Sequence, residues 1–284
     1  MPEGPDAALV RSWLFCPGSR PERFVKAVAS GADAVIADLE DAVAPAEKDE
    51  ARGQVVAWLR AERTPGVACC VRVNALGTVS GLRDVLAIVE SGAAPDYLVV
   101  PKTESAEVLG LLDTCLSGPC ARTRLLPLVE SARGLAVADA LAGQSRVAGL
   151  LFGGADLAAE LGAEMSWEPL LFARARLVQA AATAGIAVVD VPCLALDDGD
   201  ALREETSRAR RMGFTGKLAI HPGQVATINT VYSPTDAELE RARRVIAAGD
   251  AAGGGVAVVD GRMVDAPVVR AAARTIALAA RRPA

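Results

Sequence analysis

The chain has 284 residues, a formal net charge of −5 and an isoelectric point of about 5.2, and 51% of its residues are hydrophobic and 4% aromatic. This length accommodates one large α/β domain with an appendage, or two small domains. The mild acidity gives no reason to expect nucleic acid as a partner, and no basic run points to an anionic membrane.

The N-terminal stretch MPEGPDAALVRSWLF has neither the basic segment nor the long apolar segment of a signal peptide. The later apolar runs all end before the roughly 18 residues that a membrane span needs. We therefore expect a cytoplasmic protein without a membrane partner. Its six cysteines show no C-x-x-C spacing and are expected to be reduced core residues.

Eight short apolar runs recur along the chain, each followed by a turn signal and an alanine-rich amphipathic segment. They cover residues 12–16, 34–38, 68–73, 97–101, 124–129, 149–153, 186–191 and 217–220. The polar residues that end the second to eighth runs follow one another at intervals of 26 to 34 residues, close to the roughly 30 residues of one βα unit. Apolar strands that alternate with helices predict a parallel sheet covered on both faces.

Eight such units predict an α/β fold, a (β/α)8 (TIM) barrel over residues 1–225, with the active site at the C-terminal ends of the strands. An open doubly wound sheet is the alternative, but it needs no eighth strand. The first strand is not followed by G-x-G-x-x-G, which weakens a dinucleotide-binding interpretation.

Beyond His221 the pattern changes. SPTDAELERARRVIAAG predicts a helix with Ser233 as N-cap and Pro234 at the first helical position. A glycine-rich stretch with a hairpin-like pair of short strands follows, and VVRAAARTIALAARR predicts a last helix. Residues 226–284 are therefore expected to form an extension outside the closed barrel, packed on something other than their own sheet.

Charged side chains gather where the predicted strands end. In a barrel those ends meet on one face, so one mouth would collect Asp38, Glu40, Asp41, Arg72, Lys102, Glu130 and Asp156. Carboxylates that share a cavity repel one another unless a cation lies among them. His221 is the single histidine, which excludes a histidine-rich zinc centre and leaves an oxygen-held ion, Mg²⁺ or Mn²⁺.

The sequence resembles the citrate lyase β-subunit-like proteins of the HpcH/HpaI aldolase superfamily. Eight motifs carry the resemblance, in family order: RSWLFCPGSRPERFVKA, DLEDAVAPAEKDEAR, VRVNA, VPKTES, LVESARG, LFGGADLAAELG, IHPGQV and GRMVDAP. The resemblance implies a Mg²⁺-dependent lyase that breaks or forms a carbon–carbon bond in a 3-hydroxyacyl thioester. Citryl-, malyl- and citramalyl-CoA are typical substrates, and the products are an acyl thioester and an oxo acid.

Carried over by position, the resemblance makes Glu130 and Asp156 the metal ligands. From the residues alone, Glu130 could be a strand-end surface acid and Asp156 a helix N-cap. The resemblance also makes Arg72 the group that binds the substrate and stabilises negative charge on the thioester oxygen. The residues alone equally allow Arg72 an ion pair with the DLED segment.

Asp38 and Asp41 complete the catalytic group that the resemblance implies, acting through a water on the metal or by holding Arg72. Glu40 is expected to point away from them, because successive residues of a strand face opposite sides. Lys102 is expected to form a structural ion pair at the mouth, with direct substrate binding as the alternative.

The tail motif supplies Asp265, which the resemblance implies is the acid that protonates the enolate carbon, or the base in the condensation direction. Helix-start chemistry is the alternative, since Pro267 begins the last helix two residues later. In the family this tail closes over the barrel of a neighbouring subunit. Asp265 would then act in trans within a homo-oligomer, a trimer or a dimer of trimers.

The family binds CoA or a phosphopantetheine arm along the first two loops and the last. The phosphates would contact Arg23 and Lys26, and the arm or adenine would contact the backbone from Ala42 to Ala44 and at Ile220 and His221. From the residues alone, Arg23 and Lys26 can be solvated helix residues and His221 a structural side chain. PGSRP lacks the GKS or GKT of a P-loop.

Several other functions are compatible with the motifs. A class II pyruvate aldolase on free substrates, or a phosphoenolpyruvate-using barrel, would keep the fold but lacks the tail motif. The β subunit of a multi-subunit citrate lyase would act on citryl-acyl-carrier protein and need that carrier as a partner. Thioester hydrolysis is a further possible reaction. Arg72, Glu130, Asp156 and Asp265 occur together, which argues against an inactive scaffold and favours a stand-alone CoA enzyme.

Overall fold

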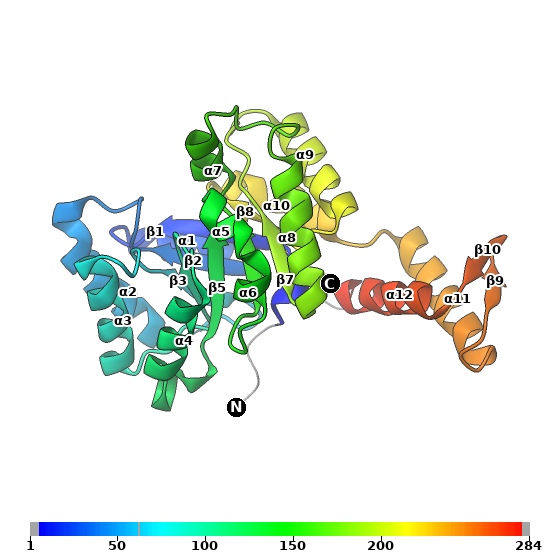
Figure 1. Ribbon diagram of the computed structural model, residues 1–284, viewed down its shortest axis with the longest axis horizontal. Helices are drawn as coiled ribbons and strands as arrows, with labels where there is room; N and C mark the ends of the chain where they lie inside the picture. The colour runs from blue at the N-terminus through cyan, green and yellow to red at the C-terminus, as the bar shows by residue number, and fades with distance from the viewer. Residues whose placement is uncertain (1–5, 62, 280–284) are drawn as a thin grey trace. The chain divides into compact units, whose positions relative to one another are not determined.

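The computed structural model describes residues 6–61 and 63–279. The chain divides between Asn229 and Thr230 into two compact units, each described by itself below (Figure 1). Within the described residues, no helix is both long and apolar enough to cross a membrane.

The first unit is a closed barrel of eight parallel strands that pair in chain order. The strands are β1 (Ser12–Pro17), β2 (Ala34–Asp38), β3 (Ala68–Arg72), β4 (Tyr97–Val100), β5 (Arg124–Val129), β6 (Gly149–Phe152), β7 (Ala187–Asp190) and β8 (Gly216–Ala219). β8 closes the ring by pairing with β1. The predicted (β/α)8 barrel is confirmed, and the alternative of an open doubly wound sheet is wrong.

Helices follow the strands and lie outside them (Figure 1). They are α1 (Glu22–Ala29), α2 (Lys48–Arg60), α3 (Val79–Ser91), α4 (Ala106–Cys115), α5 (Ala132–Ala136), α6 (Ala138–Ala142), α7 (Gly154–Leu161), α8 (Leu171–Ala184), α9 (Gly199–Met212) and α10 (Val225–Tyr232). The short 3₁₀ helices are η1 (Ala7–Leu9), η2 (Pro45–Glu47), η3 (Gly118–Arg122) and η4 (Pro222–Gln224).

Local sequence sets the bounds of these helices. The side chains of Thr78 and Asp198 accept hydrogen bonds from the backbone of the first turns of α3 and α9. The same two helices end at Gly92 and Gly213, whose φ angles of 64° and 111° lie in the left-handed region. A glycine enters that region without the clash that a Cβ atom causes.

Alternating residues of the strands fill the barrel interior. Ala34, Ile36, Ala68, Cys70, Leu126 and Leu128 belong to the buried central cluster. Because side chains alternate along a strand, the same inward face continues to Asp38, Arg72 and Glu130 at the C-terminal ends. The alternation that builds the core therefore also places these three charged side chains at the mouth.

The cysteines are all unpaired, and five of the six are buried. Cys115 is exposed because it is the last residue of α4, outside the packed face of that helix. The expectation of six core cysteines is therefore wrong for Cys115.

The second unit consists of α11 (Asp236–Ala251), β9 (Ala257–Val259), β10 (Arg262–Val264) and α12 (Ala266–Ala279). The predicted hairpin is confirmed: β9 and β10 pair antiparallel around an Asp260–Gly261 turn with φ angles of 50° and 71°, the preferred chemistry of a two-residue hairpin. A small core joins α11, β10 and α12. The part of the predicted last helix beyond residue 279 lies outside the described residues.

The predicted start of the helix after residue 232 is wrong by two residues. Thr235, not Ser233, is the N-cap of α11, because its hydroxyl accepts from the Glu238 backbone while the Glu238 side chain accepts from the Thr235 backbone. This reciprocal capping box satisfies two backbone N–H donors at once, those of Thr235 and Glu238.

Candidate active site

Asp38 and Arg72 form the central ion pair at the barrel mouth. They are directly paired residues at the ends of β2 and β3. Arg72 donates from Nε and Nη2 to the two oxygens of Asp38 at 2.7 and 2.6 Å. Asp38 is 1% exposed and also accepts from the backbone of Glu40 and Ala42. One buried carboxylate therefore fixes both the guanidinium plane and the turn that follows β2.

The rest of the Arg72 side chain has further partners. Its Nη1 lies 3.2 Å from Glu40 Oε2 and 3.4 Å from Asp41 Oδ2, and its guanidinium lies 4.8 Å from the centre of the Phe15 ring. Burial disfavours the charged form, but the hydrogen bonds and charge of Asp38 outweigh it and raise the pKa of Arg72. Arg72 is thus a fixed cation, and sequence analysis missed the aromatic support from Phe15.

Glu40 lies inside this cluster, so the expectation that it points away is wrong. β2 ends at Asp38, so strand alternation does not extend to Glu40. Glu40 is 5% exposed and lies between Arg72 Nη1 and Lys102 Nζ, the latter at 3.1 Å from Oε1. Neither carboxylate oxygen accepts a well-directed hydrogen bond from the described part of the chain. Burial raises the pKa of Glu40, with the charge of Arg72 opposing it.

Glu130 directly follows β5 and is held by the backbone of Lys102. The Lys102 N–H donates to Glu130 Oε1 at 2.7 Å, from a backbone whose φ of 50° is left-handed. Glu130 is 6% exposed, so the alternative of a surface acid is wrong. Burial raises the pKa of Glu130 to about 8; the amide of Lys102 opposes the shift, and the charges of Glu40 and Asp156 add to it.

The turn after β6 approaches Glu130 from the other side. A Cβ atom added at Gly153 would lie 2.3 Å from Glu130 Cβ and 2.9 Å from its Oε2, so only glycine fits. Asp156 is the third residue of α7 and is exposed to solvent, while Gly153 occupies the N-cap position. The N-cap alternative for Asp156 is therefore wrong, and its carboxylate lies near enough to Glu130 to influence its pKa.

A polar network around Lys48, which the sequence did not predict, supports the turn formed by the DLED segment. Lys48 Nζ donates to the carbonyls of Leu39 and Glu40 at 2.9 Å each and to Asn74 Oδ1 at 2.6 Å. Asn74 in turn donates to Asp84, which is fully buried. Lys48 and Asn74 lie within the motifs DLEDAVAPAEKDEAR and VRVNA, and their place in these motifs was the sequence signal that could have identified this network.

The donor set fits a magnesium ion. Mg²⁺ is typically bound by one or two carboxylates and completes its octahedron with water and substrate oxygens. Glu130 and Asp156 supply two carboxylates from adjacent strand ends. Burial, with the charges of Glu40 and Asp156 adding to it, raises the pKa of Glu130, and a cation beside it would stabilise its charged form. Over residues 6–61 and 63–279, no three histidine, cysteine, aspartate or glutamate side chains enclose a metal by themselves.

The residues predicted to contact the thioester carrier lie on exposed positions. Arg23 and Lys26 are exposed on α1. The backbone N–H groups of Ile220 and His221 donate to Gln224 Oε1 at 3.0 and 3.3 Å, and His221 Nδ1 accepts from the Gly223 backbone. The backbone donors at Ile220 and His221, like that of Ala42, are thus used within the chain, and the His221 carbonyl accepts from the Gln224 backbone at 3.0 Å.

Asp265 lies in the second unit, directly before α12. Its Oδ1 accepts from the Val268 backbone at 3.3 Å, the hydrogen bond expected from an aspartate at a helix start. The helix-start alternative is therefore realised in the chain, and it leaves the second carboxylate oxygen of Asp265 for other partners.

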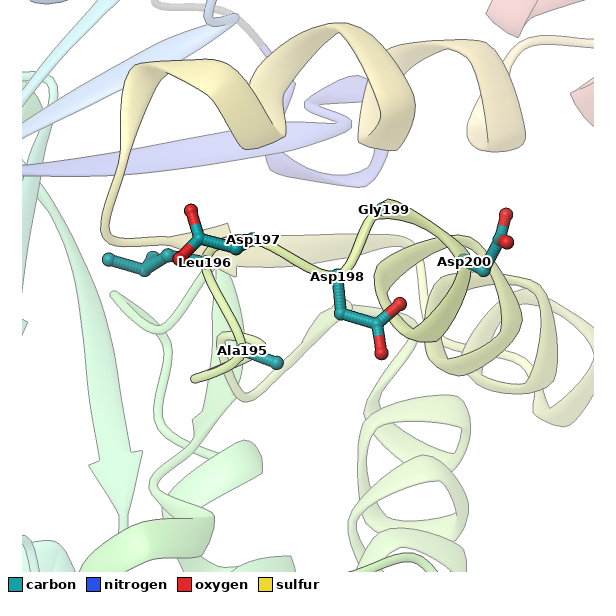
Figure 2. Close-up of a pocket in the computed structure, with 6 residues that line it drawn as sticks. All are labelled: Ala195, Leu196, Asp197, Asp198, Gly199 and Asp200. Carbon is teal, nitrogen blue, oxygen red and sulfur yellow. The ribbon is translucent and has the colours of Figure 1, made fainter.

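A hollow of the surface lies elsewhere. It measures about 590 Å³ and is lined by residues 195–200, between β7 and α9. Figure 2 shows that the carboxylates of Asp197, Asp198 and Asp200 point in different directions, so they do not converge on one ion. Asp198 is occupied as the N-cap of α9. This hollow contains none of the strand-end residues and carries no evident chemistry.

Comparisons with known proteins agree with this geometry. Residues 11–222 match the family model described as HpcH/HpaI aldolase/citrate lyase. The chain is 35% identical to citrate lyase subunit beta of Leuconostoc mesenteroides, over 95% of this chain and 93% of that protein. It is 34% identical to the L-malyl-CoA/beta-methylmalyl-CoA lyase of Cereibacter sphaeroides, over 94% of each. The crystal structure of the protein CitE of Mycobacterium tuberculosis with magnesium, acetoacetate and coenzyme A superposes with a TM-score of 0.79 at 34% identity, covering 96% of this chain and 98% of that one.

Proposed function

The chain belongs to the HpcH/HpaI aldolase/citrate lyase family and is an oxo-acid lyase, and we propose that it cleaves or forms a 3-hydroxyacyl thioester of free coenzyme A. Citryl-, malyl- and citramalyl-CoA are the substrate candidates, with an acyl-CoA and an oxo acid as products. The observation that carries the proposal is geometric: Glu130 is 6% exposed at the barrel mouth, and one of its carboxylate oxygens is held at 2.7 Å by the Lys102 N–H.

Glu130 and Asp156 are the residues that would hold Mg²⁺. When bound, the ion supplies a Lewis acid that polarises the hydroxyl and carboxylate oxygens of the substrate. Lys102 keeps one oxygen of Glu130 engaged through its N–H. Gly153 brings backbone rather than a side chain against the other oxygen of Glu130.

Arg72 would stabilise the charge that develops during cleavage. When the hydroxyl has released its proton to solvent, the carbon–carbon bond breaks: its electron pair passes into an enolate of the thioester, and the alkoxide becomes the carbonyl of the oxo acid. Asp38 engages Nε and Nη2 of Arg72, so Nη1, which lies 3.2 Å from Glu40 Oε2 and 3.4 Å from Asp41 Oδ2, is the nitrogen that would face the enolate oxygen. A donor fixed in advance by a buried partner needs no reorganisation at the moment of reaction.

Asp265 would donate the proton that the enolate carbon needs, and take it back in the condensation direction. We assign it to the active site of a neighbouring subunit in a homo-oligomer, a trimer or a dimer of trimers, with residues 226–284 as the capping segment. Arg23 and Lys26 would pair with the phosphates of coenzyme A, whose arm would follow the backbone at Ala42 and at Ile220–His221.

The same motifs support a second candidate, the β subunit of a citrate lyase that acts on citryl-acyl-carrier protein. The 35% identity to citrate lyase subunit beta and the 34% identity to a malyl-CoA lyase do not separate the two. The carrier decides between them, because one thioester is soluble and the other is attached to a protein.

The test is a coupled assay of the purified protein with Mg²⁺, acetyl-CoA and a panel of 2-oxo acids, repeated with Asp265→Asn. Product from the wild type that is lost in Asp265→Asn supports a stand-alone CoA lyase with Asp265 as acid and base. If the protein binds metal but forms no product with any oxo acid, and then turns over citryl-acyl-carrier protein, the citrate lyase β subunit replaces the stand-alone CoA lyase as the function.

A further inference from the structure

We propose that Lys102 is a positioning residue for the metal site, acting through its backbone: its left-handed conformation directs its N–H to one oxygen of Glu130 and reserves the other oxygen for the metal. The inference rests on the proposed function, because Glu130 matters here as a metal ligand. In this role Lys102 acts only on Glu130, and its backbone would contact neither the metal ion nor the reacting atoms.

The backbone conformation of Lys102 is unusual in this chain. Within the described residues only Lys102 and Asp260 adopt a positive φ without being glycine, both at 50°. Asp260 lies in an Asp-Gly hairpin turn, where such a φ is ordinary. Lys102 follows β4 in no hairpin, and a residue with a long side chain gains nothing intrinsic from this region. Such a conformation persists where surrounding contacts impose it.

Contacts on both sides of the peptide impose it. The Lys102 N–H donates to Glu130 Oε1 at 2.7 Å, and Lys102 Nζ lies 3.1 Å from Glu40 Oε1. The next residue, Thr103, is 3% exposed and donates from its hydroxyl to the Val100 carbonyl at 2.7 Å. The segment is therefore anchored before, at and after Lys102, which holds the N–H aimed at Glu130.

The two oxygens of Glu130 consequently face different segments. Oε1 accepts the Lys102 N–H, while Oε2 lies toward the turn after β6, 2.9 Å from the place where a Gly153 Cβ would lie. Asp156 lies three residues beyond Gly153, in the first turn of α7. The hydrogen bond from Lys102 therefore selects the oxygen that points to the second ligand, and it stops the carboxylate from rotating away.

The side chain at position 102 can be changed without changing this hydrogen bond. Glycine adopts a φ of 50° freely, whereas a β-branched residue strongly avoids it. Lys102→Gly and Lys102→Val both remove the ammonium, so any difference between them reports the backbone alone. Lys102→Ala is intermediate in its tolerance of the left-handed region.

The experiment measures Mn²⁺ binding to the full chain without substrate, by electron paramagnetic resonance of the free ion. We expect Lys102→Gly to bind within about threefold of the wild type. We expect Lys102→Val to raise the Kd about 10- to 100-fold, the range for lost support of a metal ligand, with Lys102→Ala between them. Saturating Mg²⁺ should restore the kcat of Lys102→Val toward that of Lys102→Gly.

Circular dichroism checks that each variant is folded, and Lys102→Ala replaces Lys102→Val in the comparison if the latter is not. If the wild type binds Mn²⁺ and the Kd of Lys102→Gly equals that of Lys102→Val (or of Lys102→Ala), this inference is overturned. The proposed function is then unaffected. A wild type that binds no Mn²⁺ overturns the proposed function, and this inference with it.

Discussion

Replacing Asp38 with asparagine tests whether one buried carboxylate organises the barrel mouth. Asp38 is 1% exposed and accepts four hydrogen bonds, two from the Arg72 guanidinium and two from the backbone of Glu40 and Ala42. Asp38→Asn keeps the shape but removes the charge and turns one acceptor into a donor that faces a donor. Asp41→Asn is the matched control, since Asp41 contacts the same guanidinium at 3.4 Å from a side chain that is 60% exposed.

The expected magnitudes differ widely. Breaking a buried ion pair costs about 3–5 kcal/mol of unfolding free energy. Glu40 and Asp41 still flank Arg72 in Asp38→Asn, so we expect about 3 kcal/mol, which corresponds to a fall in Tm of roughly 6–12 °C for a domain of this size. The half-exposed pair of Asp41 is worth about 0–1 kcal/mol. Because Arg72 loses its fixed orientation, kcat of Asp38→Asn should also fall about 10²- to 10³-fold.

The assay is urea denaturation and thermal melting of both variants at pH 7 in metal-free buffer, followed by the lyase assay with Mg²⁺. A Tm for Asp38→Asn within about 2 °C of that for Asp41→Asn would refute the reasoning, because two carboxylates of very different burial would then contribute equally.

Four further outcomes are expected. Gly153→Ala should weaken Mn²⁺ binding at least about tenfold, since its Cβ would lie 2.3 Å from Glu130 Cβ; Gly53→Ala, which meets nothing within 4 Å on α2, should bind normally. The affinity for Mg²⁺ should rise by up to about tenfold per pH unit until pH 8 and then level off, as followed by calorimetry. The buried Glu130 keeps its proton up to its pKa of about 8, and the metal must displace that proton. In metal-free buffer, the free energy of unfolding should fall as the pH rises from about 4.5 to 8. Over this range the unfolded chain has already lost the Glu130 proton that the folded chain still holds. An affinity that is flat below pH 8 would contradict this. Alkylation at pH 8, followed by mass spectrometry, should modify the exposed Cys115 first, because burial raises the pKa of Cys16 to about 11.

The sequence by itself determined the architecture. Continuous apolar runs at regular intervals predict parallel strands, and eight βα units predict a closed barrel, because hydrophobic burial and helix length are local properties of the pattern. The same pattern brings Asp38, Arg72 and Glu130 to one mouth, since their strands end on the same face. The motifs in family order identify the chemistry of the site.

Only the tertiary structure decided how these charges are arranged. The burial of Glu40, the support from Lys48 and the left-handed turn at Lys102 depend on segments that are distant in the chain; Lys102 and Glu130 are 28 residues apart. The pKa of Glu130 likewise depends on desolvation by neighbours that no local pattern specifies. Strand alternation stops where β2 stops, so the prediction for Glu40 failed at the first residues whose positions are set by tertiary contacts. Secondary structure follows local periodicity, whereas solvation and ion pairing follow the distances that folding creates.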